Sequence, residues 1–308
     1  MIFNSFDFLI FLPVSLILFW SLSKAGKNVQ NAIILALSIF FYGYWDWKFL
    51  GLLLGITTAT YFSGYFIGSE KTSKKGKKSI LLLNLFICIG LLFIFKYYNF
   101  FLESFTSVAK AFGANIISQP LRIILPVGIS FYIFTSLSYV IDVYKGKIER
   151  TTDWLAYFSY VTFFPALFSG PISRATIQLP QFFEARVFDA DKMIKGLQWT
   201  LWGFFMKLCV ADRLGLYVDA VFNNIEMHNG TSILLADIFY SFQLYCDFGG
   251  YSLIAMGVAK MFSIDLLPNF NRPYLSISFS DYWKRNHMSL TNWLMDYVYY
   301  PMIGDSSK

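Results

Sequence analysis

The chain has 308 residues, of which 56% are hydrophobic and only 14% are charged, and its mean hydropathy is +0.52. A soluble domain of this size would have too little polar surface to cover itself, so the composition excludes an ordinary soluble protein and predicts an integral membrane protein. The formal net charge of +6 would suit nucleic-acid binding. We reject that partner because the basic residues lie in short loops between apolar runs, where membrane topology requires them.

Apolar segments long enough to cross a bilayer recur through the first half of the chain. No positive charge precedes the first of them, whereas Lys24 and Lys27 follow it directly. A cleavable signal would show the opposite order, so the pattern predicts an uncleaved span with the N-terminus outside. The more polar stretch 98–120 suggests a short amphipathic helix before Gln119-Pro120. The predicted spans are 6–22, 30–46, 49–68, 79–97 and 122–141.

Basic loops support this orientation. The loop from Glu70 to Lys78 contains five lysines, and Lys145, Lys147 and Arg150 follow the fifth span. We interpret both as cytoplasmic loops that obey the positive-inside rule. The alternative for the lysine loop is a patch that binds anionic lipid, which would also place it inside.

The pattern changes after residue 153. Segment 154–172 is apolar but contains Pro165 and Gly170-Pro171, so we expect a broken or re-entrant segment. Non-helical backbone is tolerated at membrane depth only where it is buried in protein or lines a wet cavity. Residues 168–174 are therefore a candidate cavity wall, the alternative being a loop at the membrane surface. The polar stretch 175–193 is expected in the cytoplasm or on the membrane surface.

Two further apolar segments follow, a span over about 194–211 and a longer one over 233–262 that carries Gly249-Gly250 at a predicted bend. These glycines favour close helix packing. Asp247 stands beside them at membrane depth, where a carboxylate faces a partner or a water-filled cavity. It could form an ion pair with Arg285 or Arg272, or orient a catalytic histidine.

The stretch 278–301 predicts one short amphipathic helix. Ser278 and Asp281 have the spacing of a capping box, and Pro301 is expected to stop the helix. His287 would lie on an apolar face, partly desolvated, as a general base requires. The alternative is a hydrogen-bonded helix residue with no chemical role. The residues expected on that face are Trp283, His287, Leu290 and Leu294.

The remaining chemistry-bearing residues give no further site. His228 lies in a polar, turn-like stretch and is expected at the surface. Two distant histidines without clustered cysteines predict no metal site. The cysteines, Cys88, Cys209 and Cys246, lie inside apolar segments and do not indicate a redox compartment.

Six segments resemble, in the same order, those of the membrane-bound O-acyltransferase family, in particular the bacterial branch that O-acetylates alginate and other envelope polysaccharides. One departure is Asn286, where the family usually has Trp. The second departure is at the C-terminus. The family continues into a Trp-His-Gly motif with a second His that is generally the catalytic one, whereas this sequence ends at Lys308. We therefore expect a chain shortened at its C-terminus. The segments are PVGISFY (126–132), FSGPISR (168–174), KLCVAD (207–212), YCDFGGYS (245–252), NFNRPY (269–274) and WKRNHMSLTNWLMDYVY (283–299).

The resemblance implies an all-α, multi-pass protein of the bacterial cytoplasmic membrane, with roughly eight or more transmembrane or re-entrant helices in a single domain over 1–308. It implies transfer of an acetyl group from a cytoplasmic donor, acetyl-coenzyme A or another acyl thioester, to hydroxyls of an extracytoplasmic polysaccharide. No bound cofactor is expected. The implied partners are the lipid bilayer, the glycan acceptor and a secreted protein that shuttles acetyl groups.

The resemblance also assigns a site. His287 is the matched catalytic candidate, or an accessory that positions donor or acceptor if the downstream His is the base. Other functions stay open, namely D-alanyl transfer to teichoic acid, a non-catalytic remnant or scaffold and, more weakly, a transporter. The residues expected to shape the site are Asp247, Asn271, Arg272, Trp283 and Arg285.

Overall fold

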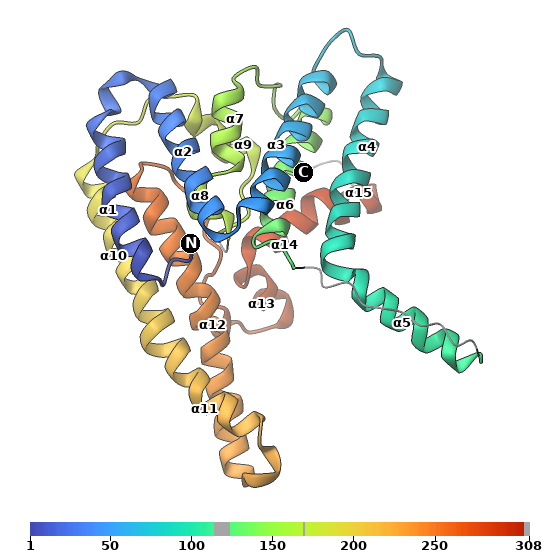
Figure 1. The fold of residues 1–308 in the computed structure, drawn as a ribbon, viewed down its shortest axis with the longest axis vertical. Helices are drawn as coiled ribbons and strands as arrows, with labels where there is room; N and C mark the ends of the chain where they lie inside the picture. The colour runs from blue at the N-terminus through green and yellow to red at the C-terminus, as the bar shows by residue number, and fades with distance from the viewer. Residues whose placement is uncertain (114–123, 169, 305–308) are drawn as a thin grey trace.

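The computed structural model describes residues 1–113, 124–168 and 170–304, and every regular element within them is a helix (Figure 1). The first four helices run up and down in turn, as four of the predicted spans require. Polar caps set their starts, because Ser5, Asp46 and Ser73 each accept a backbone N–H of the first turn that follows. The helices are α1 (Phe6–Ser21), α2 (Lys27–Trp45), α3 (Trp47–Ile67) and α4 (Lys74–Leu92).

Helix α4 does not end where the predicted span does. It passes through a π turn, η2 (Phe93–Tyr97), into α5 (Tyr98–Ala111), which leans away from the rest of the molecule (Figure 1). A π turn is a common cause of such a bend. The predicted amphipathic helix exists as α5, whereas Gln119-Pro120 lies outside the described residues.

Helix α6 (Ile129–Tyr144) starts later than the predicted span over 122–141, whose first two residues lie outside the described part. Gly128 precedes it with a φ of +76°. A Cβ on Gly128 would overlap the carbonyl O of Leu167, so this position needs glycine for both its dihedral and its close approach. The glycine thereby brings α6 against the broken segment.

The broken segment is confirmed. The chain forms three short pieces of α-helix and one 3-10 turn between residues 154 and 182. Phe163, Phe164 and Phe182 are fully buried, so the breaks lie inside the protein. The pieces are α7 (Trp154–Val161), α8 (Phe164–Leu167), α9 (Ala175–Gln178) and η3 (Leu179–Phe182).

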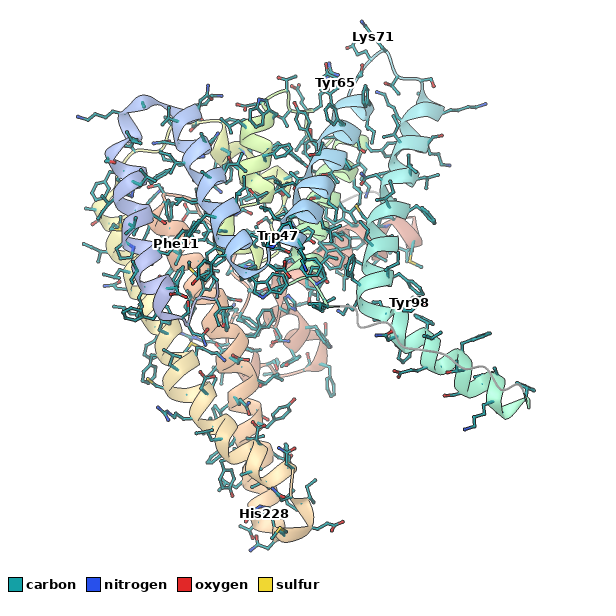
Figure 2. All side chains as sticks on the ribbon, viewed as in Figure 1. Phe11, Trp47, Tyr65, Lys71, Tyr98 and His228 are labelled. Atoms are coloured by element: carbon teal, nitrogen blue, oxygen red, sulfur yellow. The ribbon has the colours of Figure 1, made fainter. Side chains whose placement is uncertain are left out.

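A long helical hairpin reaches beyond the other helices (Figure 1). The helix does not end near residue 211, where the predicted span ends, because a π turn carries it on to Phe222. Helix α12 is one continuous helix, without the break that the predicted bend implied. Figure 2 shows His228 at the hairpin tip and Lys71 at the opposite end of the molecule. The hairpin consists of α10 (Ala190–Phe204), η4 (Phe205–Ala211), α11 (Asp212–Phe222), η5 (Ile225–Met227) and α12 (Gly230–Met261).

The last part of the chain corrects the prediction of one helix over 278–301. The capping interaction is present, since Ser278 Oγ accepts the N–H of Asp281, but the helix ends at Arg285 and a second one begins at Met288. Pro301 does not stop the helix. It stands in the first turn of α15, just after a π turn, and the helix ends at Gly304 with a φ of +74°. The elements are η6 (Pro273–Leu275), α13 (Phe279–Arg285), α14 (Met288–Leu294), η7 (Met295–Tyr299) and α15 (Tyr300–Ile303).

Two helices in the described residues are long and apolar enough to cross a membrane, Trp47–Ile67 and Lys74–Ala111. Phe6–Ser21 and Ile129–Tyr144 are apolar but shorter. Only 11% of the most apolar window of Lys74–Ala111 is buried inside the protein, and Phe86 on that helix is 77% exposed. Apolar side chains that point outward from a helix of this length suit contact with lipid.

Candidate functional site

His287 lies at the joint between α13 and α14. Its backbone is left-handed, with φ 46° and ψ 49°, and its carbonyl O accepts the N–H groups of Leu290 and Thr291. A left-handed conformation is uncommon for a residue other than glycine and is unfavourable by about 1–2 kcal/mol. Such strained residues persist only where neighbours hold them, and they cluster at functional sites.

The joint breaks the apolar face that the sequence predicts. His287, Leu290 and Leu294 line one cavity, whereas Trp283, on α13, does not line it and is 57% exposed. The prediction that all four residues share one face is therefore wrong. The helix turns at His287, so residues on its two sides no longer follow one helical period.

The loop 269–272 holds the joint through its backbone. The N–H of Asn271 donates to the carbonyl O of Arg285, and the N–H of Met288 donates to the carbonyl O of Asn269, both at 2.8 Å. These bonds fix the chain on either side of His287. Asn271 contributes through its backbone. The side chains of Asn271 and Arg272 are exposed, and the described part of the chain supplies no ion-pair partner for Arg272.

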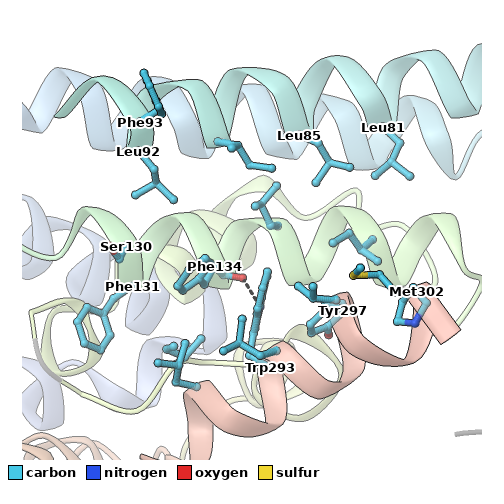
Figure 3. Close-up of a pocket in the computed structure, with 18 of the residues that line it drawn as sticks. Leu81, Leu85, Leu92, Phe93, Ser130, Phe131, Phe134, Trp293, Tyr297 and Met302 are labelled. Atoms are coloured by element: carbon cyan, nitrogen blue, oxygen red, sulfur yellow. Dashed lines mark hydrogen bonds between the residues drawn. The ribbon is translucent and has the colours of Figure 1, made fainter. Parts of the chain in front are cut away.

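Beside His287 is a cavity of about 1030 Å³. Figure 3 shows it between α4, which contributes Leu81, Leu85 and Leu92, and the facing helices α6 and α14–α15. Most lining side chains are apolar, with Lys96 and Lys145 among the exceptions. A predominantly apolar cavity with a few polar groups is the usual form of a ligand site.

His287 offers this cavity a free acceptor or donor. Its Nε2 atom is buried and has no hydrogen-bond partner among the described residues. The ring of Phe248, from α12, meets the imidazole edge-to-face, with ring centroids 4.8 Å apart and planes at 88°. An apolar contact of this kind restricts the imidazole without occupying a ring nitrogen.

Within the predicted wall 168–174, most of the described residues are buried. Phe168, Ile172 and Ser173 are each less than 9% exposed, and Ile172 lines the cavity. This burial favours the cavity wall over an exposed loop. Buried backbone that borders a cavity is the arrangement that membrane proteins tolerate at depth.

The helix α14 and the turn η7 are fastened to α6 behind the cavity. Trp293 Nε1 donates to the carbonyl O of Phe134 at 3.0 Å, and Tyr297 Oη donates to Asp142 Oδ2 at 2.7 Å. Next to this pair, Asp296 forms an ion pair with Arg174 of the wall segment. These contacts join α14 and η7 to α6 and to the wall segment.

Asp247 is part of an ion pair, but the predicted partners are wrong. Its carboxylate lies 2.6 Å from Lys207 Nζ, and Lys207 also contacts Asp212 at 2.7 Å. Arg285 instead pairs with Asp281 at 2.8 Å within α13, and this contact lowers the pKa of the Asp281 carboxyl. The described residues show no hydrogen bond or ion pair between Asp247 and His287.

A smaller cavity of about 250 Å³ lies between α12 and the loop 269–272. Tyr245, Asn269, Asn271 and Arg272 are among the polar residues that line it. The two bonds from this loop to the joint therefore connect the second cavity to His287. Among the residues that the structure describes, no three His, Cys, Asp or Glu side chains converge into a metal-binding group.

Sequence reasoning missed Asn269, Ser289 and Phe248 as members of the site. Phe248 meets the imidazole, and Asn269 and Ser289 bond to each other beside it. All three stand inside the segments quoted for the family resemblance, which was the available signal. Their position beside His287 is set by the fold, which the sequence alone does not give.

Comparison with known proteins agrees with the resemblance. The model of the family described as membrane-bound O-acyltransferase matches residues 41–308. The chain is 36% identical over 306 residues to the probable alginate O-acetylase AlgI of Pseudomonas putida. The aligned residues are 99% of this chain and 62% of the relative. The chain is 31% identical to the peptidoglycan O-acetyltransferase of Helicobacter pylori, over 97% of this chain and 61% of the relative.

A third relative has a different acyl group in its name. The teichoic acid D-alanyltransferase of Bacillus subtilis is 30% identical over 186 residues, which are 58% of this chain and 46% of the relative. The chain spans about three fifths of the length of the two O-acetylating relatives. The family match over most of the chain confirms the resemblance seen in the motifs: the chain belongs to the membrane-bound O-acyltransferase family.

Proposed function

We propose that the protein transfers an acyl group, acetyl, from a cytoplasmic thioester to hydroxyl groups of an extracytoplasmic polysaccharide. The observation that carries the proposal is the Nε2 of His287, which has no partner in the described part of the chain and lies at the wall of a largely apolar cavity, in a chain of this family. The names of the O-acetylating relatives support acetyl as the group transferred and an envelope glycan as the acceptor.

In this chemistry His287 acts as the general base. The Nε2 lone pair takes the proton of the acceptor hydroxyl while the hydroxyl oxygen attacks the thioester carbonyl. The new C–O ester bond forms, the C–S bond breaks, and the departing thiolate receives the proton from the imidazolium. This role requires a neutral ring with its proton on Nδ1, and a buried Nε2 with no competing partner among the described residues suits it.

The cavity gives the donor a path to His287. It follows α6 from Ser130 to Lys145, a distance of about 22 Å at 1.5 Å per residue. Figure 3 shows α14, which begins beside His287, starting at the Phe131 end of the cavity. Lys145 stands at the other end, in the loop proposed to be cytoplasmic, where its charge suits the phosphates of a coenzyme or carrier.

We propose that the protein is a single domain of the bacterial cytoplasmic membrane, with roughly eight or more membrane-spanning or re-entrant helices. The basic loops after α1, α3 and α6 support an orientation with these loops inside and the N-terminus outside. A secreted acetyl-shuttling protein and the glycan would then meet the protein on its outer side.

The acyl group is identified by its product. The full chain is expressed in a bacterium that lacks its own envelope O-acyltransferase, and esters on the isolated glycan are released with base and separated. We expect acetate above the level of a vector control. D-alanine in place of acetate would overturn the acetyl assignment and favour alanylation, and the absence of both esters would overturn the proposed activity in favour of a scaffold.

A further inference from the structure

We infer that Asn269 is the positioning residue of the candidate site: its side chain and its carbonyl hold the two residues that follow His287. The inference rests on the proposed function for its catalytic consequence, but its structural part can be tested without activity. Asn269 does not touch the cavity beside His287 and is not proposed to contact reacting atoms.

Asn269 is 1% exposed and forms four hydrogen bonds. Its Oδ1 accepts the hydroxyl of Ser289 at 2.8 Å and the N–H of Ser289 at 3.3 Å. Its Nδ2 donates to Ser252 Oγ of α12 at 3.1 Å, and its carbonyl O accepts the N–H of Met288 at 2.8 Å. One buried residue thus joins α12, the loop 269–272 and the first turn of α14.

The direction of each bond is fixed by the backbone. The N–H of Ser289 can only donate, so the amide of Asn269 must turn its oxygen, not its nitrogen, toward Ser289. The N–H of Ile172 donates to Ser289 Oγ at 3.0 Å, so the hydroxyl proton of Ser289 is free to point at Asn269. The network therefore also ties the wall segment 168–174 to the same asparagine.

The network requires asparagine at this position. An aspartate has the acceptor but no donor for Ser252, and it would place an added charge at a buried position. An alanine removes both functions and leaves the Ser289 N–H without its partner. The side chain of a glutamine is one methylene too long for a site in which every neighbour is already fixed.

The consequence for His287 follows from its strained backbone. A left-handed histidine keeps its conformation only while the residues around it are held. Asn269 holds Met288 and Ser289 on one side, and the N–H of Asn271 holds Arg285 on the other. Without the Asn269 side chain, the first turn of α14 loses the bonds that set the direction of the imidazole into the cavity.

A matched control exists in α4. Asn84 is also buried, at 3% exposed, and its Nδ2 also joins two helices by donating to a serine hydroxyl, Ser63 Oγ at 3.1 Å. It does not line the cavity. Asn84→Ala therefore removes a comparable buried bond at a site where His287 should not respond.

The test measures His287 itself in the full chain, in lipid nanodiscs. The ring nitrogen signals of histidine are recorded by ¹⁵N NMR and assigned to His287 by their loss in His287→Gln. We expect Asn269→Ala to shift or broaden the His287 signals, and Asn84→Ala to leave them in place. Equal effects of the two variants, or unchanged His287 signals in Asn269→Ala, would overturn the inference.

Kinetics provide the second readout. We expect Asn269→Ala to lower kcat about tenfold or more while the donor KM stays within about twofold, because misplacement of a base affects the transition state more than donor binding. If Asn269→Ala does not fold, Ser289→Ala takes its place with the same expected direction, and unchanged NMR signals and kcat in it overturn the inference. A chain with no transfer activity in the unsubstituted form contradicts the proposed function alone, since the NMR comparison still decides the role of Asn269.

Discussion

The packing of α10 against α12 depends on glycines at specific positions. A Cβ on Gly250 would lie 2.8 Å from the carbonyl O of Gly203 and 3.2 Å from the backbone N of Lys207. Neither backbone atom can move without its helix. A Cβ on the adjacent Gly249 would lie 3.4 Å from the terminal methyl of Met206, which is an ordinary contact with a flexible group.

Alanine substitution at these two positions therefore separates packing from propensity. Both variants gain the same helix propensity, about 1 kcal/mol, so the difference between them isolates the packing effect. To restore ordinary contact at Gly250, the two helices must separate by about 0.6 Å, and overpacking of this kind destabilises by about 1–3 kcal/mol. We expect Gly250→Ala to be less stable than Gly249→Ala by that amount.

Unfolding of both variants by sodium dodecyl sulfate in mixed micelles, followed by tryptophan fluorescence, measures this difference. Equal free energies of unfolding would refute the close approach of α10 and α12. The loss should also reach the site, because α12 carries Phe248 against the imidazole. A Gly250→Ala chain that is less stable than Gly249→Ala but equally active would show that the hairpin does not support His287.

Lys207→Met should destabilise the chain by about 1–2 kcal/mol, more than Asp247→Asn, because the lysine side chain is 14% exposed and joins two carboxylates whereas Asp247 is 49% exposed. Thermal unfolding of the two variants measures which is less stable, and a less stable Asp247→Asn would contradict the prediction. Tyr297→Phe removes the hydrogen-bond donor to the buried Asp142 carboxylate of α6 and should reduce the free energy of unfolding by about 1–3 kcal/mol. A denaturant titration that shows no loss of stability would refute the role given to that bond. Leu85→Trp should narrow the cavity and lower kcat/KM for the donor, whereas Phe86→Trp should not, because the Phe86 side chain points away from the cavity. Donor titrations compare the two variants, and equal kcat/KM values would exclude the cavity as the donor path.

Local patterns in the sequence predicted the helices well where polar caps and basic loops frame apolar runs. Helices α1 to α4, the interruptions at Pro165 and Gly170-Pro171 and the cap at Ser278 all follow from such signals. Apolar periodicity and capping act within a few residues, so they can be read without knowledge of the fold.

The joint at His287 could not be predicted in this way. No glycine marks the left-handed position, and the helical spacing continues across it. The helix ends there because Asn269 and Asn271, about twenty residues earlier, bind the backbone on both sides. Tertiary hydrogen bonds override the local pattern, and they leave no period in the sequence.

The ion-pair partner of Asp247 could not be predicted from the sequence for the same reason. A carboxylate at membrane depth indicates that a cation is near, but not which one. The hairpin brings Lys207 from α10's π turn to Asp247, forty positions later in the chain. That pairing depends on the glycine contacts that set the register of α10 against α12.

The catalytic role proposed for His287 is tested most directly by a pair of single substitutions in the full chain. His287→Gln removes the base, and His228→Gln makes the same change at the hairpin tip, outside both cavities. The measurement is the initial rate of transfer of labelled acetyl groups to glycan, at equal amounts of folded protein. Our account predicts a fall of about 10²-fold or more for His287→Gln and an unchanged rate for His228→Gln. Transfer by His287→Gln at the unsubstituted rate would contradict it.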